Sequence, residues 1–184
     1  MKDLNMIFAG FGGQGVLFAA KVMAYMGLIE NKHISWLPSY GPEMRGGTAN
    51  CSVCISDDEI GSPLVLSPNV LVAMNLPSLH KFIDDVEPGG LVVVDSSLID
   101  EKVTRDDVTV FYVPATSLAE ENEIKGLANM ILVGKVQSEI DLAPKEILDQ
   151  AVIKCVPASK AKMLDFNRLA IEIGRRCPGR AMHS

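Results

Sequence analysis

Positive charge is scarce in this chain of 184 residues. Its 17 lysine and arginine side chains stand against 23 aspartate and glutamate side chains, which gives a formal net charge of −6. Proteins that hold nucleic acid by its phosphates carry a basic patch or stripe, and the sequence shows none. We therefore expect no nucleic-acid partner.

Long apolar runs are also missing. The apolar window 16–28 is interrupted by Lys21, and the window 127–133 is too short to cross a bilayer. The first residues, Met-Lys-Asp-Leu-Asn, carry no signal-peptide pattern. Since 48% of the residues are hydrophobic, the chain can still bury a sizeable core. We expect a folded cytoplasmic protein with no membrane partner.

Cysteine is rare, with four residues in the chain. Cys51 and Cys54 form a C-x-x-C pair, but they lie in the predicted strand 50–56, where positions three apart point to opposite faces. A redox C-x-x-C would open a helix instead, and a zinc or iron–sulfur site needs more ligands than the chain groups together. We expect buried, reduced cysteines and no metal bound by this chain.

A glycine-rich loop is the most prominent feature that the sequence does contain. It lies between the apolar runs 4–9 and 16–28 and reads Gly10-Phe11-Gly12-Gly13-Gln14-Gly15. This order predicts a strand, a tight turn and a helix whose first amides favour an anion. The first, third and last residues of the loop fit the G-x-G-x-x-G spacing, which by itself is a weak sign of a dinucleotide site.

The nucleotide motifs around this loop are incomplete. No G-K-[ST] follows the glycines, which excludes a P-loop. A nicotinamide site requires an acidic residue at the end of the second strand, and that strand ends in Ser35-Trp36-Leu37-Pro38. Glu30 has roughly the right separation but lies in a turn before the strand. We therefore do not favour an NAD site.

Catalytic constellations are equally sparse. His33, His80 and His183 are not paired with a nucleophile or carboxylate motif. Asp95 follows a predicted central strand, at the place where open α/β sheets bind ligands, but capping of the next turn explains it at least as well. We identify no catalytic residue, and the chain alone does not look like a complete enzyme.

Strands and helices alternate along the chain. We expect strands at 4–9, 33–37, 50–56, 69–74, 91–94 and 108–113, and helices at 14–26, 77–84, 117–126, 127–137, 144–154 and 160–173. This order predicts one α/β domain over residues 1–174, with a Rossmann-like, open, mostly parallel sheet, helices on both faces and a helical C-terminal end. The tail 175–184 is expected to be partly disordered.

Local signals set several expected boundaries. Gly27 is expected to stop the first helix, Pro38 to end the second strand, and a capping box, Ser117 to Glu120, to open the third helix. The first helix is apolar nearly all round, so another chain is expected to cover part of it. The expected buried face of the last helix consists of Met163, Phe166, Ala170 and Ile173.

A second loop combines turn formers with isolated charged and aromatic residues. It reads Ser39-Tyr40-Gly41-Pro42-Glu43-Met44-Arg45-Gly46-Gly47-Thr48. Loops of this composition often carry function, and we favour that interpretation. The alternative is an ordinary connection whose Glu43–Arg45 pair lies on the surface and contributes little.

The two glycine-containing loops, in this order and spacing, resemble the gamma subunit of 2-oxoacid:ferredoxin oxidoreductases. Supporting matches are Gly89-Gly90 before the strand that ends in Asp95-Ser96-Ser97-Leu98, and Gly126-Leu127-Ala128-Asn129-Met130 leading to Gly134. The second loop is more similar to the 2-oxoglutarate and branched-chain members than to the pyruvate members. The similarity extends from the first strand to about the final helix.

The resemblance implies a non-autonomous subunit of an enzyme that decarboxylates a 2-oxoacid on thiamine diphosphate, forms an acyl-CoA and passes electrons through iron–sulfur clusters to ferredoxin. It implies alpha and beta subunits as partners, with a ferredoxin-like delta subunit in some forms. Thiamine diphosphate, magnesium and the clusters would belong to those subunits, and coenzyme A would be a substrate. The rival interpretation is a stand-alone nucleotide- or CoA-binding module.

The resemblance also implies which residues face a ligand or a partner. Carried over by position, they are Gly10, Gly12, Gly13, Gln14, Gly15, Tyr40, Glu43, Arg45, Gly46 and Gly47. We expect the two loops to meet at the strand ends. Arg45 would then supply a cation for a carboxylate or phosphate; the alternative is a salt bridge to Glu43 or to an acid of a partner.

Overall fold

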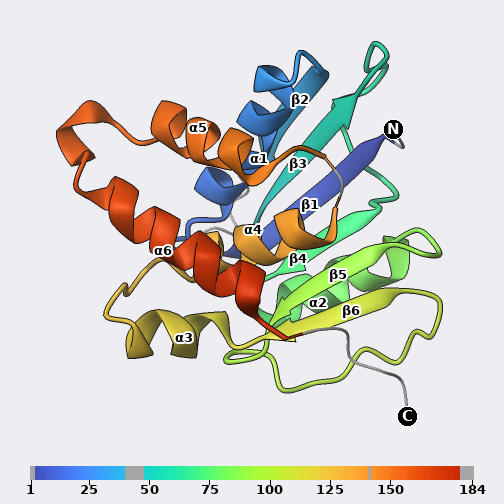
Figure 1. Ribbon diagram of the computed structural model, residues 1–184. Helices are drawn as coiled ribbons and strands as arrows, with labels where there is room; N and C mark the ends of the chain where they lie inside the picture. The colour runs from blue at the N-terminus through green and yellow to red at the C-terminus, as the bar shows by residue number, and fades with distance from the viewer. Residues whose placement is uncertain (1–2, 40–47, 141, 179–184) are drawn as a thin grey trace.

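One mixed sheet organises the chain. The computed structural model describes residues 3–39, 48–140 and 142–178. Its strands lie in the order β2-β3-β1-β4-β5-β6 (Figure 1). β1 pairs in parallel with β4, β4 with β5 and β5 with β6, whereas β3 runs antiparallel to β1 and β2. The strands are β1 (Leu4–Phe11), β2 (His33–Ser39), β3 (Thr48–Ser56), β4 (Val70–Ala73), β5 (Leu91–Asp95) and β6 (Thr109–Val113). The predicted open, mostly parallel sheet is confirmed.

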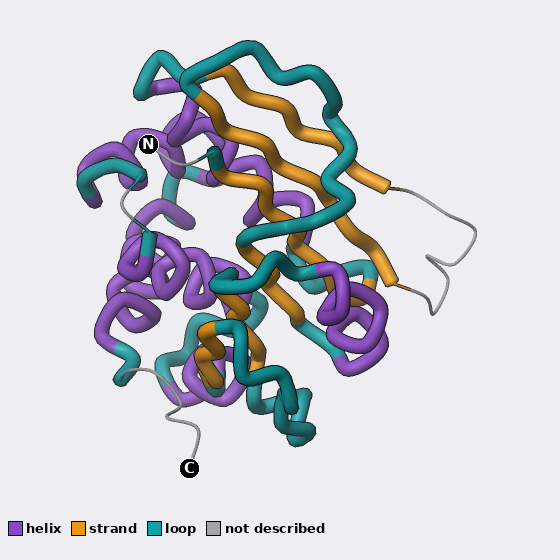
Figure 2. The backbone as a smooth tube through the Cα atoms, turned by 90° about the vertical axis from the view of Figure 1, so that its right-hand side faces the viewer, coloured by secondary structure: helices purple, strands orange, loops and turns teal. Residues whose placement is uncertain are grey.

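Helices cover both faces of this sheet, as predicted. One face carries most of the helical residues, in α1 (Val16–Ile29), α3 (Ala115–Glu121), α4 (Ala128–Glu139), α5 (Lys145–Cys155) and α6 (Met163–Arg176), with the short η3 (Ala158–Lys160) before α6. The other face carries α2 (Leu76–Phe82) and the 3-10 turn η2 (Ile83–Asp85). The connection 57–69 crosses the strands on this second face (Figure 2). Within the described ranges, no helix is long and apolar enough to cross a bilayer.

The alternation of side chains along β1 explains why both faces need cover. Met6 and Phe8 belong to the core beneath α1 and α4, whereas Ile7 and Ala9 belong to the core beneath α2. The neighbouring β4 buries all four of its residues. A parallel strand in the centre of a sheet requires apolar side chains on both sides, which is the pattern that its sequence showed.

Strand β2 lies at the edge of the sheet and is longer than expected. It continues through Pro38, which pairs with Cys51 of β3, so the proline does not end the strand. An edge strand tolerates proline because the missing N–H need not serve a ladder. The strand is half-exposed, in contrast to the central β4.

Helix α1 does not stop at Gly27. A Cβ atom at Gly27 would lie 2.7 Å from Ile55 Cγ2 and 2.9 Å from Ile34 Cγ2, so this glycine allows the helix to approach β2 and β3. The chain leaves the helix at Glu30 and turns at Asn31, which has a positive φ of 56°. The apolar surface of α1 packs on β1, β2 and β3 on one side and on α5 of the same chain on another (Figure 1), so its composition does not require a second chain.

Helix α6 buries part of the expected face. Ala170 is fully buried and Met163 and Ile173 pack partly buried against the core, but Phe166 is 46% exposed. The other buried residues are Asn167, Ile171 and Gly174. Gly174 explains the choice, because a Cβ there would lie 1.8 Å from the carbonyl oxygen of Ile131 in α4. Close approach of two helix backbones selects small residues over large apolar ones. The helix also continues through Arg176, two residues into the predicted tail.

Candidate functional site

The glycine loop turns sharply between β1 and α1, as predicted. Gly13 and Gly15 have positive φ values of 91° and 75°, a region that favours glycine. The amide of Gln14 donates to the carbonyl of Phe11 at 3.3 Å, and Gly15 is the N-cap of α1. The loop lies at the carboxyl ends of the parallel strands, next to the point between β1 and β4 where the chain connections diverge to opposite sides. Open α/β sheets bind their ligands at such a point.

Gln14 closes this loop from within. Its Oε1 accepts a hydrogen bond from the Phe11 amide at 2.6 Å, and its Nε2 donates to the carbonyl of Met74 at 3.0 Å. The side chain therefore ties the end of β1 to the end of β4. Gly10 lies directly beneath it, since a Cβ at Gly10 would be 2.6 Å from Gln14 Oε1. Both residues have a structural task that the sequence did not reveal.

Gly15 takes part in a second contact within the chain. Asn129, at the start of α4, donates from Nδ2 to the carbonyl of Gly15 at 3.0 Å, and a Cβ on Gly15 would lie 2.4 Å from that nitrogen. Gly15 is the third glycine of the G-x-G-x-x-G spacing, the position that permits close packing, and here the packed group is the Asn129 side chain of the same chain. Asn129 is 3% exposed, and its Oδ1 has no hydrogen-bond partner among the residues that the structure describes.

Gly12 and Gly13 form the outward part of the loop. Both are exposed, and nothing lies within 4 Å of a Cβ placed on Gly13. Gly10, Gln14 and Gly15 make contacts that hold the loop together, while Gln14 and Gly15 stay partly exposed and Gly12 and Gly13 are exposed. That these five residues face a ligand or a partner stays a prediction.

A small crevice adjoins this exposed tip. Its volume is about 260 Å³, and its lining residues are Gly13, Gln14, Met74, Leu98, Thr116, Ala119, Glu120, Lys125, Gly126 and Ala128. They come from the glycine loop, from the ends of β4 and β5, and from α3 with its connection to α4. Glu120 and Lys125 are the charged members of this lining. The sequence marked Glu120 only as part of a capping box, and nothing in the local context of Lys125 marks it.

The Asp95 side chain makes hydrogen bonds within the fold and does not line the crevice. Its side chain is fully buried, and its oxygens accept hydrogen bonds from Thr116 Oγ1 at 2.6 Å and from the amides of Ser97 at 3.1 Å and Thr116 at 3.3 Å. The capping interpretation is therefore correct. The carboxylate also reaches α3, which lies 21 residues further along the chain.

These contacts explain why the predicted capping box at Ser117 is wrong. Helix α3 begins two residues earlier, at Ala115, and no residue next to its start caps it through a side chain. Asp95 accepts from the Thr116 amide, and Ser97 Oγ accepts from the Ser117 amide at 3.0 Å. The N-terminal amides of α3 are thus satisfied from the loop after β5, where a local pattern cannot indicate them.

The second loop falls largely outside the described residues. This applies to Tyr40, Glu43, Arg45, Gly46 and Gly47, and to the expectation that the two loops meet. The described residues on either side are informative, because Thr48 pairs with Phe11 at the end of β1 and Ser39 pairs with Asn50. The chain therefore enters and leaves this segment at the edge of the sheet that carries the glycine loop.

The two C-x-x-C thiols diverge as predicted. Cys51 lies in the core beneath α1, and Cys54 lies in the core on the opposite face of β3. Burial raises the pKa of Cys51 to about 12 and also raises the pKa of Cys54. Thiols in this state are neutral and poor nucleophiles or metal ligands. Among the described residues, no group of three or more histidine, cysteine or acidic side chains is placed to hold a metal ion.

Comparison with known families identifies the domain. A model of the pyruvate ferredoxin/flavodoxin oxidoreductase family matches residues 5–177, from β1 to the end of α6. The chain belongs to this family. The match includes the glycine loop, Asp95 and Asn129, so the internal contacts described above lie within the family domain.

Relatives within the family have known names. The chain is 38% identical over 172 residues to the ketoisovalerate oxidoreductase subunit VorA of Methanothermobacter thermautotrophicus, covering 94% of this chain but 36% of that protein. It is 36% identical over 165 residues to the 2-oxoglutarate synthase subunit KorC of Methanocaldococcus jannaschii, covering 87% of this chain and 88% of that protein. The chain thus spans about a third of the length of one relative and most of the other.

A solved structure supports the fold. The gamma subunit of a keto/oxoacid ferredoxin oxidoreductase from Geobacter sulfurreducens superposes with a TM-score of 0.79 at 28% identity. The superposition covers 93% of this chain and 95% of the other. The Rossmann-like α/β architecture predicted from the sequence is therefore that of a family gamma subunit.

Proposed function

We propose that this chain is the gamma subunit of a multi-subunit 2-oxoacid:ferredoxin oxidoreductase. The observation that carries the proposal is the family match over residues 5–177, combined with a crevice of about 260 Å³ at the ligand edge of the sheet. Sites that enclose a whole small molecule usually measure about 300–1,000 Å³. A crevice below that range suits a domain that forms one side of a shared site.

The chemistry of the site agrees with a supporting subunit. The lining of the crevice provides one acid and one base, Glu120 and Lys125, and none of the cysteines. The divergent Cys51 and Cys54 do not fit an iron–sulfur cluster. In the proposed enzyme, thiamine diphosphate, magnesium and the clusters therefore belong to the alpha, beta and delta partners, which carry out oxidative decarboxylation and pass electrons to ferredoxin.

The exposed tip of the glycine loop is the proposed contribution of this chain. Gly12 and Gly13 present backbone without side chains, and Lys125 lines the adjoining crevice. Backbone amides and an ammonium group suit a phosphate-bearing substrate such as coenzyme A, or the acidic edge of a partner subunit. Arg45 and the rest of the second loop are proposed to lie on the same edge, since Thr48 returns beside Phe11.

The substrate we propose is 2-oxoglutarate, on the basis of the second-loop resemblance. A branched-chain 2-oxoacid is the specific alternative, because the chain is 38% identical to the VorA relative and 36% identical to the KorC relative. These values are too close to separate the two substrates. An assay with both acids is required.

The test is to purify the assembly from its native source and to measure 2-oxoacid-dependent reduction of a viologen dye. We expect alpha and beta chains to copurify, activity with 2-oxoglutarate that exceeds activity with 2-oxoisovalerate or pyruvate, and no activity without coenzyme A. The isolated chain serves as the control and should be inactive. A monomer that is active alone, or that purifies saturated with a nucleotide, would instead support the stand-alone binding module.

A further inference from the structure

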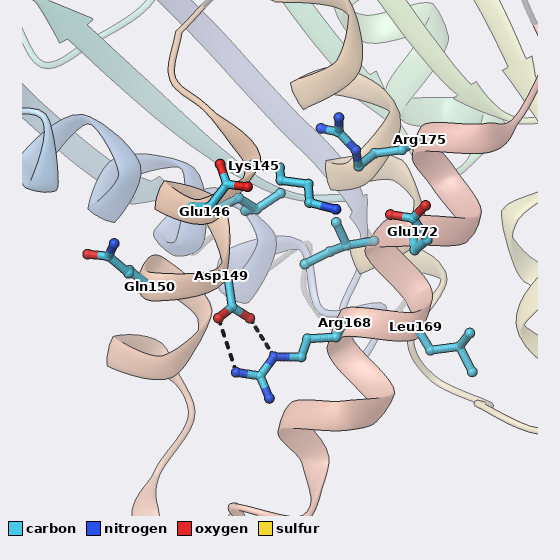
Figure 3. A pocket seen from close by; sticks show the side chains of 10 residues that line it. Lys145, Glu146, Asp149, Gln150, Arg168, Leu169, Glu172 and Arg175 are labelled. Carbon is cyan, nitrogen blue, oxygen red and sulfur yellow. Dashed lines mark hydrogen bonds and ion pairs between the residues drawn. The ribbon is translucent and has the colours of Figure 1, made fainter.

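A groove between α5 and α6 forms a second hollow in the molecule. Its volume is about 650 Å³, and it shares no lining residue with the crevice beside the glycine loop. Its lining residues are Lys145, Glu146, Leu148, Asp149, Gln150, Arg168, Leu169, Ile171, Glu172 and Arg175. Figure 3 shows these side chains rising from the two helices that form its walls. Leu148 and Ile171 are buried and give the groove an apolar base.

Some of the charges in this groove are already neutralised. Arg168 on α6 forms a two-pronged ion pair with Asp149 on α5, whose Nη2–Oδ2 distance is 3.1 Å (Figure 3). Glu172 accepts from Arg176 at 2.7 Å. These pairs connect neighbouring parts of the same chain and leave little net charge for an outside molecule.

Two cations of the groove have no such partner among the described residues. Lys145 reaches from α5 toward α6, and Arg175 reaches from α6 toward α5 (Figure 3). Neither forms an ion pair with another described residue, and Arg175 Nη1 is buried without a hydrogen-bond acceptor. A buried guanidinium N–H without an acceptor is costly, so this end of the groove favours an acidic group from another molecule. Glu146 is the one unpaired acid of the lining, which leaves a net positive charge of one on the unpaired groups.

An exposed apolar side chain stands at the α6 wall of the groove. Leu169 lines the groove and is 41% exposed. Together with the buried Leu148 and Ile171, it makes part of the lining apolar. A small anion would meet the cations and leave Leu169 uncovered, whereas a protein segment lying in the groove would contact both.

We propose that the α5–α6 groove binds an amphipathic helix of a partner subunit, whose acidic side chain meets Lys145 and Arg175 and whose apolar face covers Leu169. This inference rests on the proposed function. Helix-in-groove recognition uses an apolar stripe with a few charged contacts at its edge. The VorA relative supplies a reason to expect such a neighbour, because this chain spans 36% of its length and the matching domain is therefore continuous with further polypeptide.

The experiment titrates the purified partner chains into the full-length chain and measures assembly by native mass spectrometry and sedimentation. Leu169→Asp should weaken assembly by about thirtyfold and Arg175→Glu by at least about tenfold, as expected for central apolar and buried charged contacts. Leu66→Asp is the matched control, because Leu66 is 73% exposed and lies in the connection that crosses the other face. Its effect should stay within about twofold.

The isolated variants must fold for this comparison. Both substituted side chains are at least partly exposed, so urea unfolding of the single chain should change little for each variant. Arg175→Lys serves as a second variant, which keeps the charge and should retain more of the affinity than Arg175→Glu.

The outcomes separate the two proposals. If the wild-type chain binds no alpha or beta subunit, the proposed function fails and this inference fails with it. If the wild-type complex forms and both groove variants assemble like wild type, only the groove assignment is overturned. It is also overturned if Leu66→Asp weakens assembly equally, if the isolated chain forms a dimer that Arg175→Glu dissociates, or if decanoate alone stabilises the isolated chain through Arg175.

Discussion

The glycine loop and the α5–α6 groove use their polar groups in opposite ways. In the loop, the Gln14 side chain accepts a hydrogen bond from the Phe11 amide and donates one to the Met74 carbonyl. Asn129 donates a hydrogen bond to the Gly15 carbonyl. In the groove, by contrast, Lys145 and Arg175 have no ion-pair partner within the part of the chain that the structure describes. The most conspicuous motif of the sequence is therefore largely engaged in internal contacts, and the inconspicuous α5–α6 pair carries the groove for which we propose a partner.

The difference has a physical origin. In the loop, Gln14 and Asn129 hold backbone groups at its two ends, whereas Phe11, Gly12 and Gly13 stay exposed. In the groove, Arg175 Nη1 is buried and has no acceptor among the described residues, so this site favours an acidic group from another molecule. A motif that is conspicuous in the sequence can therefore have most of its polar groups hydrogen-bonded within the chain, with few available to a ligand.

The largest expected effect comes from Gly174→Ala, which would disturb the packing behind both the glycine loop and the groove. Helix α6 forms one wall of the groove, and α4 carries the Asn129 that closes the glycine loop. An added Cβ would lie 1.8 Å from the Ile131 carbonyl oxygen, so we expect a loss of about 3 kcal/mol or more in the free energy of unfolding. Urea unfolding measures this loss.

Gly61→Ala is the matched control for this prediction. No atom lies within 4 Å of a Cβ at Gly61, so the free energy of unfolding should change by less than about 0.5 kcal/mol. Equal stability of the two variants would contradict the close packing of α4 on α6.

The next prediction is a loss of stability at high pH that comes from Cys51, in the core beside β1. Burial holds the pKa of Cys51 at about 12, above the roughly 8.5 of a free thiol. Between these values the unfolded chain has lost the thiol proton and the folded chain has kept it. Stability is therefore fully present below about pH 8.5 and falls as the pH rises, by up to about 1.4 kcal/mol per pH unit.

Cys51→Ala isolates this contribution. The substitution should lower stability by a constant amount near neutral pH and should flatten the decline above about pH 9. Urea unfolding of both proteins across that range provides the comparison. Parallel curves for the two proteins would show that the Cys51 thiol does not carry the dependence.

Gln14→Ala sharpens the comparison at the loop itself. It removes the acceptor for the Phe11 amide and the donor to the Met74 carbonyl, and we expect a loss of about 1–2 kcal/mol in the free energy of unfolding. Hydrogen exchange should show faster exchange of the Phe11 amide, with little change in α5 and α6. Unchanged stability and unchanged exchange would mean that Gln14 is free to serve a ligand instead.

Arg168→Ala gives the smallest expected effect and tests the paired part of the groove. The Arg168 and Asp149 side chains are 45% and 38% exposed, so their ion pair should contribute little to the free energy of unfolding. The loss should shrink further in high salt, because solvent-exposed pairs are screened. A double-mutant cycle with Asp149→Ala measures the coupling energy, and a large coupling energy that does not change with salt would contradict the assignment.

The sequence was most informative about elements whose pattern is local. Continuous apolar residues placed β4 in the centre of the sheet, and alternation placed Cys51 and Cys54 on opposite faces of β3. The strand, glycine turn and helix at the N-terminus followed the same logic. Periodicity along the chain is sufficient wherever a residue's surroundings are set by its own strand or helix.

The sequence was least informative where a distant residue decides the outcome. The start of α3 depends on Asp95 and Ser97, the loop closure depends on Asn129, and the helical course through Gly27 depends on β2 and β3. The buried face of α6 depends on the backbone of α4. Each of these partners lies more than one helical turn away in the sequence from the residue that it contacts.

By itself, the sequence determined the α/β class, the order of strands and helices, and the glycine turn, because hydrophobic periodicity and backbone freedom act locally. Only the tertiary structure decided that Gly10 and Gly15 serve the chain's own side chains, that Gly12 and Gly13 face outward, and that Arg175 lies unpaired in a groove. The reason is that burial and pairing of a polar group depend on segments far along the chain, which meet it only after folding.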